Sequence, residues 1–235
     1  MARPCGESRI VGRTNDRTEG RGARGGGSVA QDGAEDWERR VAGCATLDEL
    51  GALVRGCVRC GLRAGCRGVV FGEGHERARL CLIGEGPGAR EDELGRPFVG
   101  AAGQLLDRIL DAAGFAREQV YISNVVLCRP PGNRVPADDE IAACRPHLER
   151  RLQLLDPGIV VLLGATALRA VVGGQARISR ARGRWQRRDG RFVMATYHPA
   201  YLLRNPAAKK DAWTDFRMVS ALYGRLYGGA CGADA

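Results

Sequence analysis

Apolar residues along the chain follow two patterns, which alternate. Nearly continuous apolar runs, which predict buried strands, lie at 79–85, 119–128, 158–164 and 191–200. Apolar residues at three- and four-residue steps, which predict helices, lie at 47–57, 100–114, 137–156, 165–173 and 207–227. Gly114 is expected to end the second of these helices, and Asp138 to cap the start of the third.

This alternation predicts the fold class. Strands separated by helices form a parallel sheet with helices on both faces, so we expect a three-layer α/β/α fold with about four parallel strands. In such sheets ligands bind beyond the C-terminal ends of the strands. Those ends carry the segments GEGPG, SNVVLCRPP, LGATA and TYHPAYLLR, so the unusual residues of the chain should gather at one edge.

The domain organisation follows from composition. The 235 residues allow one sizeable domain plus tails. Residues 1–33 are rich in Gly and Arg and are expected to be disordered, 34–228 to form the domain, and 229–235 to be a flexible tail. The sequence has no apolar run long enough for a membrane span and no leader pattern, so a cytoplasmic protein without a membrane partner is expected.

Charge and cysteine usage narrow the function. The formal net charge of +9 favours a polyanionic partner such as nucleic acid, although a GC-rich genome that encodes Arg in place of Lys would leave the same trace. Nine cysteines without an export signal argue against a disulfide scaffold and for metal or thiol chemistry.

Four cysteines have spacings typical of a metal site. A CxxC pair is followed by two distant cysteines, the set being Cys57, Cys60, Cys128 and Cys144. Four thiolates could hold a zinc ion or an iron–sulfur cluster, and spacing alone does not choose between them. Cys66 is the most credible rival ligand, whereas Cys81, inside an apolar strand, is expected in the core.

The segment LIGEGPGAREDELGRPFVG, residues 82–100, resembles a phosphate-binding loop but carries four carboxylates. Three other strand-end residues suggest a different ligand. A flat neutral ring with carbonyl and imide groups needs an aromatic face, an amide edge and a hydrogen-bond donor, which Phe98, Asn124 and His198 can supply. A nucleobase fits this set, with its phosphates left to arginines outside.

Three segments, GEGPGAREDELGRPFVGAAGQLLDRIL, YISNVVLCRPPGNRVP and HPAYLLRNP, closely resemble the family-4 uracil-DNA glycosylases, the iron–sulfur type. The resemblance covers about residues 50–225. It implies the uracil-DNA glycosylase fold, excision of uracil from DNA, and a [4Fe–4S] cluster on the four cysteines named above.

Two departures refine this expectation. A related class captures uracil-DNA covalently through a histidine in an extra basic loop, which would lie between Cys128 and Cys144; this chain has neither histidine nor insertion there, so turnover is expected. The best-known uracil-DNA glycosylases carry a water-activating aspartate where this chain has Gly86. The alternative is a non-catalytic or covalent uracil-DNA-binding protein of the same fold.

Roles for the site residues follow from the resemblance and from the chemistry. Phe98 would stack on the flipped base, Asn124 would read its edge, and Glu91 would crowd the C5 position. His198 would donate to the uracil O2 as negative charge develops there. Three further residues would serve the sugar side and the leaving base: Glu85 or Asp92 by positioning water or stabilising the sugar cation, and Gly86 by offering a backbone N–H.

Contacts with DNA are expected from apolar and basic residues. Leu202 or Leu203 would fill the stack that the flipped nucleotide leaves. The basic stretch 176–191 is expected to form a hairpin arm on DNA phosphates through Arg182 and Arg184, with Arg204 as a further contact. We expect a monomer, associated with the nucleoid when acting. Two rival classes are a zinc-knuckle binding module and a redox sensor that uses the CxxC pair.

Overall fold

The computed structural model describes residues 29–174 and 176–228. Its first helix, α1 (Val29–Gly43), begins inside the stretch 1–33 that was expected to be disordered. The remaining parts of the expected tails, residues 1–28 and 229–235, lie outside the described residues.

Within the described residues, the sheet contains six strands: β1 (Glu73–Gly74), β2 (Leu80–Gly84), β3 (Tyr121–Asn124), β4 (Ile159–Leu163), β5 (Gln186–Arg188) and β6 (Arg191–Thr196). They lie in the order β1-β3-β2-β4-β6-β5. The inner four pair in parallel, which confirms the predicted parallel sheet. The two short edge strands pair antiparallel: β1 was not predicted, and β5 lies in the stretch that was expected to form a hairpin arm.

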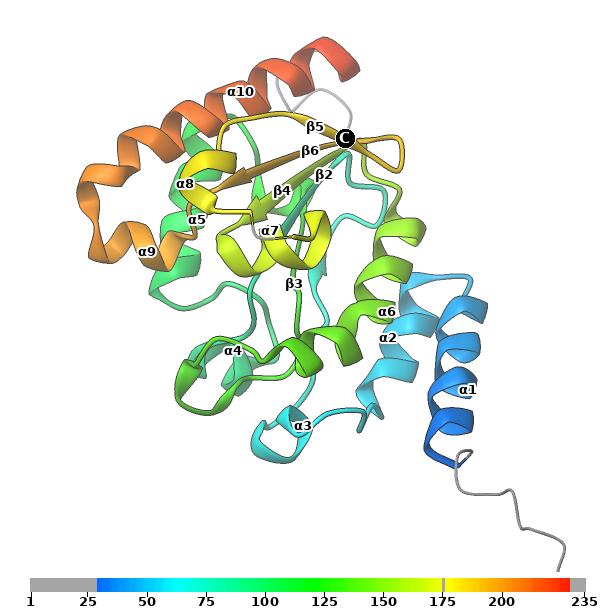
Figure 1. Cartoon of the computed structure of the whole chain (residues 1–235). Helices are drawn as coiled ribbons and strands as arrows, with labels where there is room; N and C mark the ends of the chain where they lie inside the picture. Colours follow the sequence, from blue (N-terminus) through cyan, green and yellow to red (C-terminus); the bar gives the residue numbers. More distant parts are fainter. Residues whose placement is uncertain (1–28, 175, 229–235) are drawn as a thin grey trace, which may run out of the picture.

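Helices cover both faces of this sheet, as Figure 1 shows. One face packs against α5 (Ala101–Ala112) and α10 (Lys209–Tyr227). The other packs against α2 (Leu47–Arg55), α6 (Asp138–Leu155) and α7 (Ala165–Val172), with α1 outside α6. Among the described residues there are also four short α-helices, α3 (Leu62–Gly65), α4 (Ala89–Leu94), α8 (Ile178–Ala181) and α9 (Pro199–Arg204), and three 3-10 helices, 117–119, 131–133 and 206–208. The three-layer α/β/α prediction is confirmed.

The two-residue period of a strand divides the core between the two layers. In β2, Leu80 and Leu82 face α5 and α10, whereas Cys81 and Ile83 face the layer of α6 and α7. All four are fully buried, which explains why this strand reads as a continuous apolar run. Cys81 is a core residue, as predicted.

Helix ends agree with the sequence in one case and differ in another. Gly114 follows the last turn of α5 with a φ of 82°, as expected of a residue that ends a helix. The cap of α6 was predicted at Asp138, but the capping position is Ala137. There the Glu140 carboxylate accepts the Ala137 N–H at 2.8 Å, so a side chain from inside the helix satisfies that donor.

The parallel register brings the C-terminal ends of four strands to one edge. Gly84 of β2 pairs with Asn124 of β3, and Leu163 of β4 pairs with Thr196 of β6. The chain leaves β2 first for β3 on one side and later for β4 on the other, so β2 marks the point where the order reverses, the usual place of a ligand site. In the part of the chain that is described, no helix is both long and apolar enough to span a membrane.

Candidate active site and thiol-lined cavity

A cavity of about 560 Å³ lies at this edge of the sheet. Each of the four parallel strands contributes to its wall from its C-terminal end: Glu85 after β2, Asn124 of β3, Gly164 after β4 and His198 after β6. Its remaining wall comes mainly from the segment 86–102 and from residues 130–135 and 200–204. The residues at the strand ends therefore lie together in the fold, as predicted.

Asn124 is 1% exposed, and its side-chain Oδ1 has no hydrogen-bond partner within the protein. The residue lines the cavity, so this buried acceptor is available to a ligand there. A buried carbonyl oxygen without a partner costs stability, and native proteins keep such groups where function uses them. Gly84, whose role the sequence did not indicate, leaves the space that the Asn124 amide occupies. A Cβ on Gly84 would lie 2.5 Å from Asn124 Oδ1 and equally close to the Phe98 ring.

Phe98 is buried in the cavity wall and has a φ of 52°, in the left-handed region that non-glycine residues rarely occupy. The centre of its ring lies 5.6 Å from that of His198, so the two aromatic faces adjoin in the same cavity. Arg117 holds this unusual turn by donating to the carbonyl oxygens of Pro97, at 2.6 Å, and of Phe98.

Glu91 braces the loop that carries Phe98. Its Oε1 accepts the backbone N–H groups of Val99 and Gly100 at 2.9 and 2.8 Å, while the side chain also lines the cavity. Asp92, the next residue of α4, turns away from the cavity and accepts the N–H of Arg67 through Oδ1 at 2.9 Å. The expectation of a catalytic Asp92 does not agree with this position, because successive helical residues differ in direction by about 100°.

His198 caps the start of α9 with its Nδ1, which accepts the backbone N–H of Ala200 at 3.1 Å. Burial, and secondarily the nearby Arg204 charge, lower the pKa of His198 to about 4. The ring is therefore neutral at pH 7. Because Nδ1 accepts, the hydrogen of the neutral ring sits on Nε2, which leaves one N–H donor for the cavity.

Glu85 enters the cavity from the end of β2. Its Oε2 accepts the hydroxyl of Thr166 at 2.5 Å, which holds the carboxylate in one orientation. Thr166, buried in the first turn of α7, was missed in the sequence, although its place in LGATA at a strand end was a usable signal. Gly86 lines the cavity as expected, and a Cβ there would lie 2.8 Å from Val126 Cγ2, so this backbone leaves no room for an aspartate.

The two candidate wedge leucines have different environments. Leu202 is 1% exposed and packs with Leu105 of α5 and Ala212 of α10, so it belongs to the core and the expectation for it was wrong. Leu203 is 40% exposed. Tyr201, which the sequence analysis did not single out, is similarly exposed and lines the cavity mouth.

The predicted basic arm, 176–191, is a hairpin only in part: residues 186–191 join β5 to β6 at the edge of the sheet, whereas residues 178–181 form α8. Its Arg182 turns inward: Nε and Nη2 donate to the carboxylate of the buried Asp215 at 3.0 and 2.6 Å. That guanidinium is already paired in the fold, which argues against its predicted DNA contact. Arg184 is exposed, and Arg204 is exposed at the cavity mouth.

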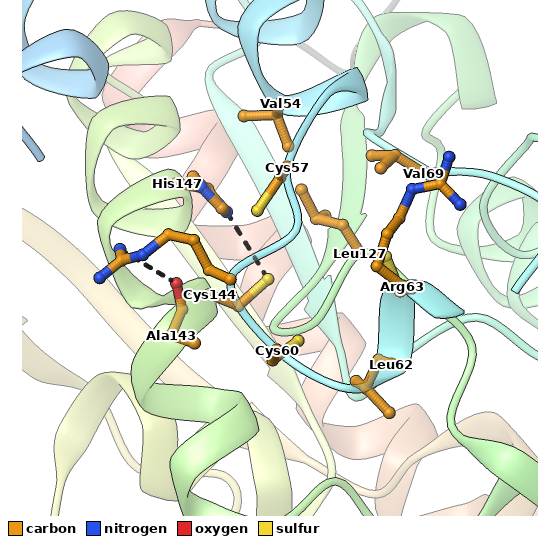
Figure 2. Close-up of a pocket in the computed structure, with 12 residues that line it drawn as sticks. Val54, Cys57, Cys60, Leu62, Arg63, Val69, Leu127, Ala143, Cys144 and His147 are labelled. Carbon is orange, nitrogen blue, oxygen red and sulfur yellow. Dashed lines mark hydrogen bonds between the residues drawn. The ribbon is translucent and has the colours of Figure 1, made fainter. Parts of the chain in front are cut away.

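A second cavity, shown in Figure 2, is lined by thiols. The four predicted ligands come together there: Cys57, Cys60, Cys128 and Cys144. They arrive from three places, the loop after α2, the segment after β3, and α6. The rest of the wall is largely apolar, with Val54, Leu62, Val69 and Leu127 among its members. Burial raises the pKa of Cys144 to about 12 and also raises that of Cys128, so both are protonated at pH 7, and binding of a metal would release the protons.

Two residues missed in the sequence adjoin this cavity. His147 lies one turn after Cys144, with Nδ1 at 3.7 Å from the Cys144 sulfur, and Trp37 Nε1 donates to His147 Nε2 at 2.9 Å. Cys66 lies beside Cys128 but does not line the cavity. Among the residues that are described, no three His, Cys, Asp or Glu side chains form a ready-made single-metal group.

Comparison with known proteins agrees with this site. Residues 71–217 match the family model of the uracil DNA glycosylase superfamily, so the class of protein is that of the uracil-DNA glycosylases. The chain is 47% identical to the type-4 uracil-DNA glycosylase of Thermotoga maritima over 163 residues, 68% of this chain and 84% of that protein. It is 38% identical to the type-4 enzyme of Sulfurisphaera tokodaii over 75% of this chain and 84% of that protein. A type-5 uracil-DNA glycosylase of Thermus thermophilus is 33% identical over 55% of this chain and 68% of its own length. The chain therefore belongs to the uracil-DNA glycosylases, and within them to the type-4 family.

Proposed function

We propose that the chain removes uracil from DNA by hydrolysing the N-glycosidic bond of a flipped nucleotide, which leaves an abasic site. The observation that carries this proposal is the unpartnered Asn124 Oδ1, which is buried, lines the cavity at the strand ends, and shares its wall with the rings of Phe98 and His198. An aromatic face, an amide edge and one fixed N–H donor match the three kinds of contact that uracil offers.

Base selection rests on Asn124. Its Oδ1 accepts the uracil N3–H and its Nδ2 donates to O4, whereas cytosine presents an acceptor at N3 and a donor at C4. A bidentate pair of this kind contributes about 1–3 kcal/mol of discrimination. Glu91 fixes the loop beside the ring through Val99 and Gly100, which supports a role in closing the C5 side against the thymine methyl group.

The bond breaks with its electron pair moving onto the base, while positive charge develops at C1′ of the sugar. His198 Nε2–H donates to the uracil O2, where the negative charge gathers, and Gly86 can add a backbone N–H. Water then adds to C1′ and loses a proton to the solvent, and the uracil anion takes up a proton and leaves as neutral uracil. Glu85, held by Thr166, has the charge and the fixed orientation to stabilise the sugar cation and to position that water. One preorganised donor is commonly worth about 10²–10³-fold in rate.

DNA binding supplies the flipped nucleotide. Unstacking costs a few kcal/mol. Leu203, exposed on α9, is our candidate for the vacated stack, with Arg204 and Arg184 as phosphate contacts. Because its substrate is genomic DNA, we propose that the protein acts in the cytoplasm, at the nucleoid, as a monomer.

We propose that the thiol-lined cavity holds a [4Fe–4S] cluster on Cys57, Cys60, Cys128 and Cys144. An all-sulfur donor set within a mostly apolar wall suits the soft irons of such a cluster. A bound cluster would cross-link three parts of the chain: the loop after α2, the segment after β3, and α6. It lies outside the base cavity, and the glycosidic chemistry above uses none of its atoms.

The alternatives are less well supported. The relatives carry the names of glycosylases, which gives no support to a non-catalytic or covalent binder. A redox sensor or a zinc-knuckle module would not use the four residues at the strand ends, which are Glu85, Asn124, Gly164 and His198.

Incubation with DNA that contains one uracil, followed by alkali, tests the proposal. We expect strand breaks at the uracil and release of free uracil. A stable protein–DNA adduct would support covalent capture, and binding without breaks would support the non-catalytic alternative. Either result would overturn the proposal.

A further inference from the structure

Arg151 is a fully buried arginine with no assigned role, at 0% exposure on α6. Its Nη1 donates to the carbonyl oxygen of Phe71 at 2.8 Å, and its Nη2 donates to the carbonyl oxygen of Asn124 at 3.1 Å. The guanidinium also lies 5.3 Å from the centre of the Phe71 ring. Arg151 thus contacts the main chain of Asn124, the residue whose side chain is proposed to read uracil.

The charge of Arg151 has no carboxylate partner. Every ion pair found within residues 29–174 and 176–228 involves other arginines, and Arg151 Nε has no hydrogen-bond partner there. Burying a cation without an acid is costly, and even paired buried charges can often be replaced by apolar side chains with no loss of stability. A purely structural role is therefore a poor explanation of this arginine.

The position of Arg151 on α6 links the two cavities. Residues three and four apart lie on one helix face, and Cys144, His147 and Arg151 follow that spacing. Cys144 and His147 line the thiol cavity, and Arg151 reaches the end of β3. A four-thiolate cluster carries net negative charge, so a cluster on Cys144 would supply the anion that Arg151 otherwise lacks.

We propose that Arg151 is a positioning residue for base recognition: it holds the Asn124 carbonyl from the side of the thiol cavity and so fixes the Asn124 amide against the uracil edge. The inference rests on the proposed function. It predicts that binding of the base, rather than folding alone, depends on this buried guanidinium.

The test uses Arg151→Met, which keeps an unbranched stem about as far as the arginine Nε but removes the donors and the charge, in the complete chain purified with its iron. Free uracil as a product inhibitor measures the base site directly, and single-turnover excision, normalised to active sites, measures chemistry. We expect the inhibition constant for uracil to rise about tenfold or more and the preference for uracil over cytosine to shrink. Arg151→Lys, which keeps the charge and one donor nitrogen in place of three, should restore part of both.

Arg150→Met is the matched control. Arg150 precedes Arg151 on the same helix and also donates to a carbonyl oxygen, that of Cys44, at 2.9 Å through Nε, on the side of α1. We expect this variant to keep wild-type uracil inhibition. Visible absorbance and thermal unfolding report cluster content and folding for each variant.

The outcomes separate the two proposals. If wild-type protein excises uracil and Arg151→Met lowers the melting temperature without changing uracil inhibition or base preference, Arg151 is structural and the inference is wrong. If Arg151→Met does not fold, Arg151→Lys decides: wild-type inhibition by uracil overturns the inference, and weakened inhibition supports it. Failure of the wild type to excise uracil would instead overturn the proposed function.

Discussion

Gly84 at the end of β2 and Asn124 at the end of β3 are paired in the sheet, and the space above Gly84 is filled by the Asn124 amide. A Cβ on residue 84 would lie 2.5 Å from Asn124 Oδ1, which is closer than any stable contact. Because residue 84 has no side chain, β2 leaves room for the Asn124 amide, the group that is proposed to read uracil.

Gly84→Ala should displace the Asn124 amide and the adjoining Phe98 ring. A displacement of about 1 Å in a catalytic site can cost about 10²-fold in rate, so a loss of that order is expected in single-turnover excision. Gly190→Ala is a control, because a Cβ there contacts nothing within 4 Å, although its φ of 80° adds some strain. Near-normal excision by Gly84→Ala would show that the amide tolerates another position.

Asn124→Asp should weaken uracil excision and admit some cytosine. A carboxyl group accepts from the cytosine amino group and, when protonated, donates to its N3, whereas the asparagine amide faces that amino group with a donor. Matched uracil and cytosine oligonucleotides under single-turnover conditions measure both effects. His198→Ala serves as the contrast, since it should lower uracil excision by about 10²-fold without admitting cytosine. A change of base preference in the His198 variant instead would reverse the two assignments.

The pKa of His198, lowered by burial to about 4, has a consequence for stability. The unfolded chain binds a proton near pH 6.5, before the folded chain does, so the free energy of unfolding falls as the pH drops from about 6.5 towards 4. His198→Asn should lose this part of the pH dependence. Denaturant unfolding of both proteins at pH 7 and pH 5 measures it, and NMR titration of the ring measures the pKa itself. A ring that titrates near 6.5 would show that burial does not lower the pKa of His198.

Arg182 and Arg184 should separate folding from DNA binding. Arg182→Ala leaves the buried Asp215 carboxylate without its cation, which is expected to cost about 3–5 kcal/mol of stability. Arg184→Ala should leave stability unchanged but reduce the salt dependence of binding to uracil-free duplex. Urea unfolding and binding titrations at several salt concentrations test the pair. If Arg182→Ala flattens the salt dependence at unchanged stability, the inward pairing is not its main role.

The cluster proposal predicts a brown protein with equal iron and sulfide when purified without oxygen. Cys128→Ser should lower the melting temperature and the visible absorbance together, because the cluster would join the segment after β3 to α6. Cys81→Ser changes another buried thiol, which lies outside the thiol cavity, and it should leave the absorbance unchanged. A colourless, active protein with one zinc per chain would replace the cluster by a zinc site.

The sequence by itself determined the alternation of strands and helices, and with it the edge at which Asn124 and His198 meet. Both depend on the local period of apolar residues, since strand ends in a parallel sheet converge whatever the loops do. The Gly-rich loop and the four cysteines were visible for a similar reason: their spacing and their place in the chain are informative without coordinates.

The tertiary structure alone decided which of several similar neighbours faces the site. Leu202 and Leu203 are identical in sequence terms, yet the packing of α9 against α5 and α10 buries the first and exposes the second. Glu91 and Asp92 differ only by one step around α4. The sequence does not distinguish Arg182 from its basic neighbours, because its partner Asp215 lies 33 residues later in the chain. Orientation and long-range pairing depend on contacts between distant segments, and composition and periodicity do not record those contacts.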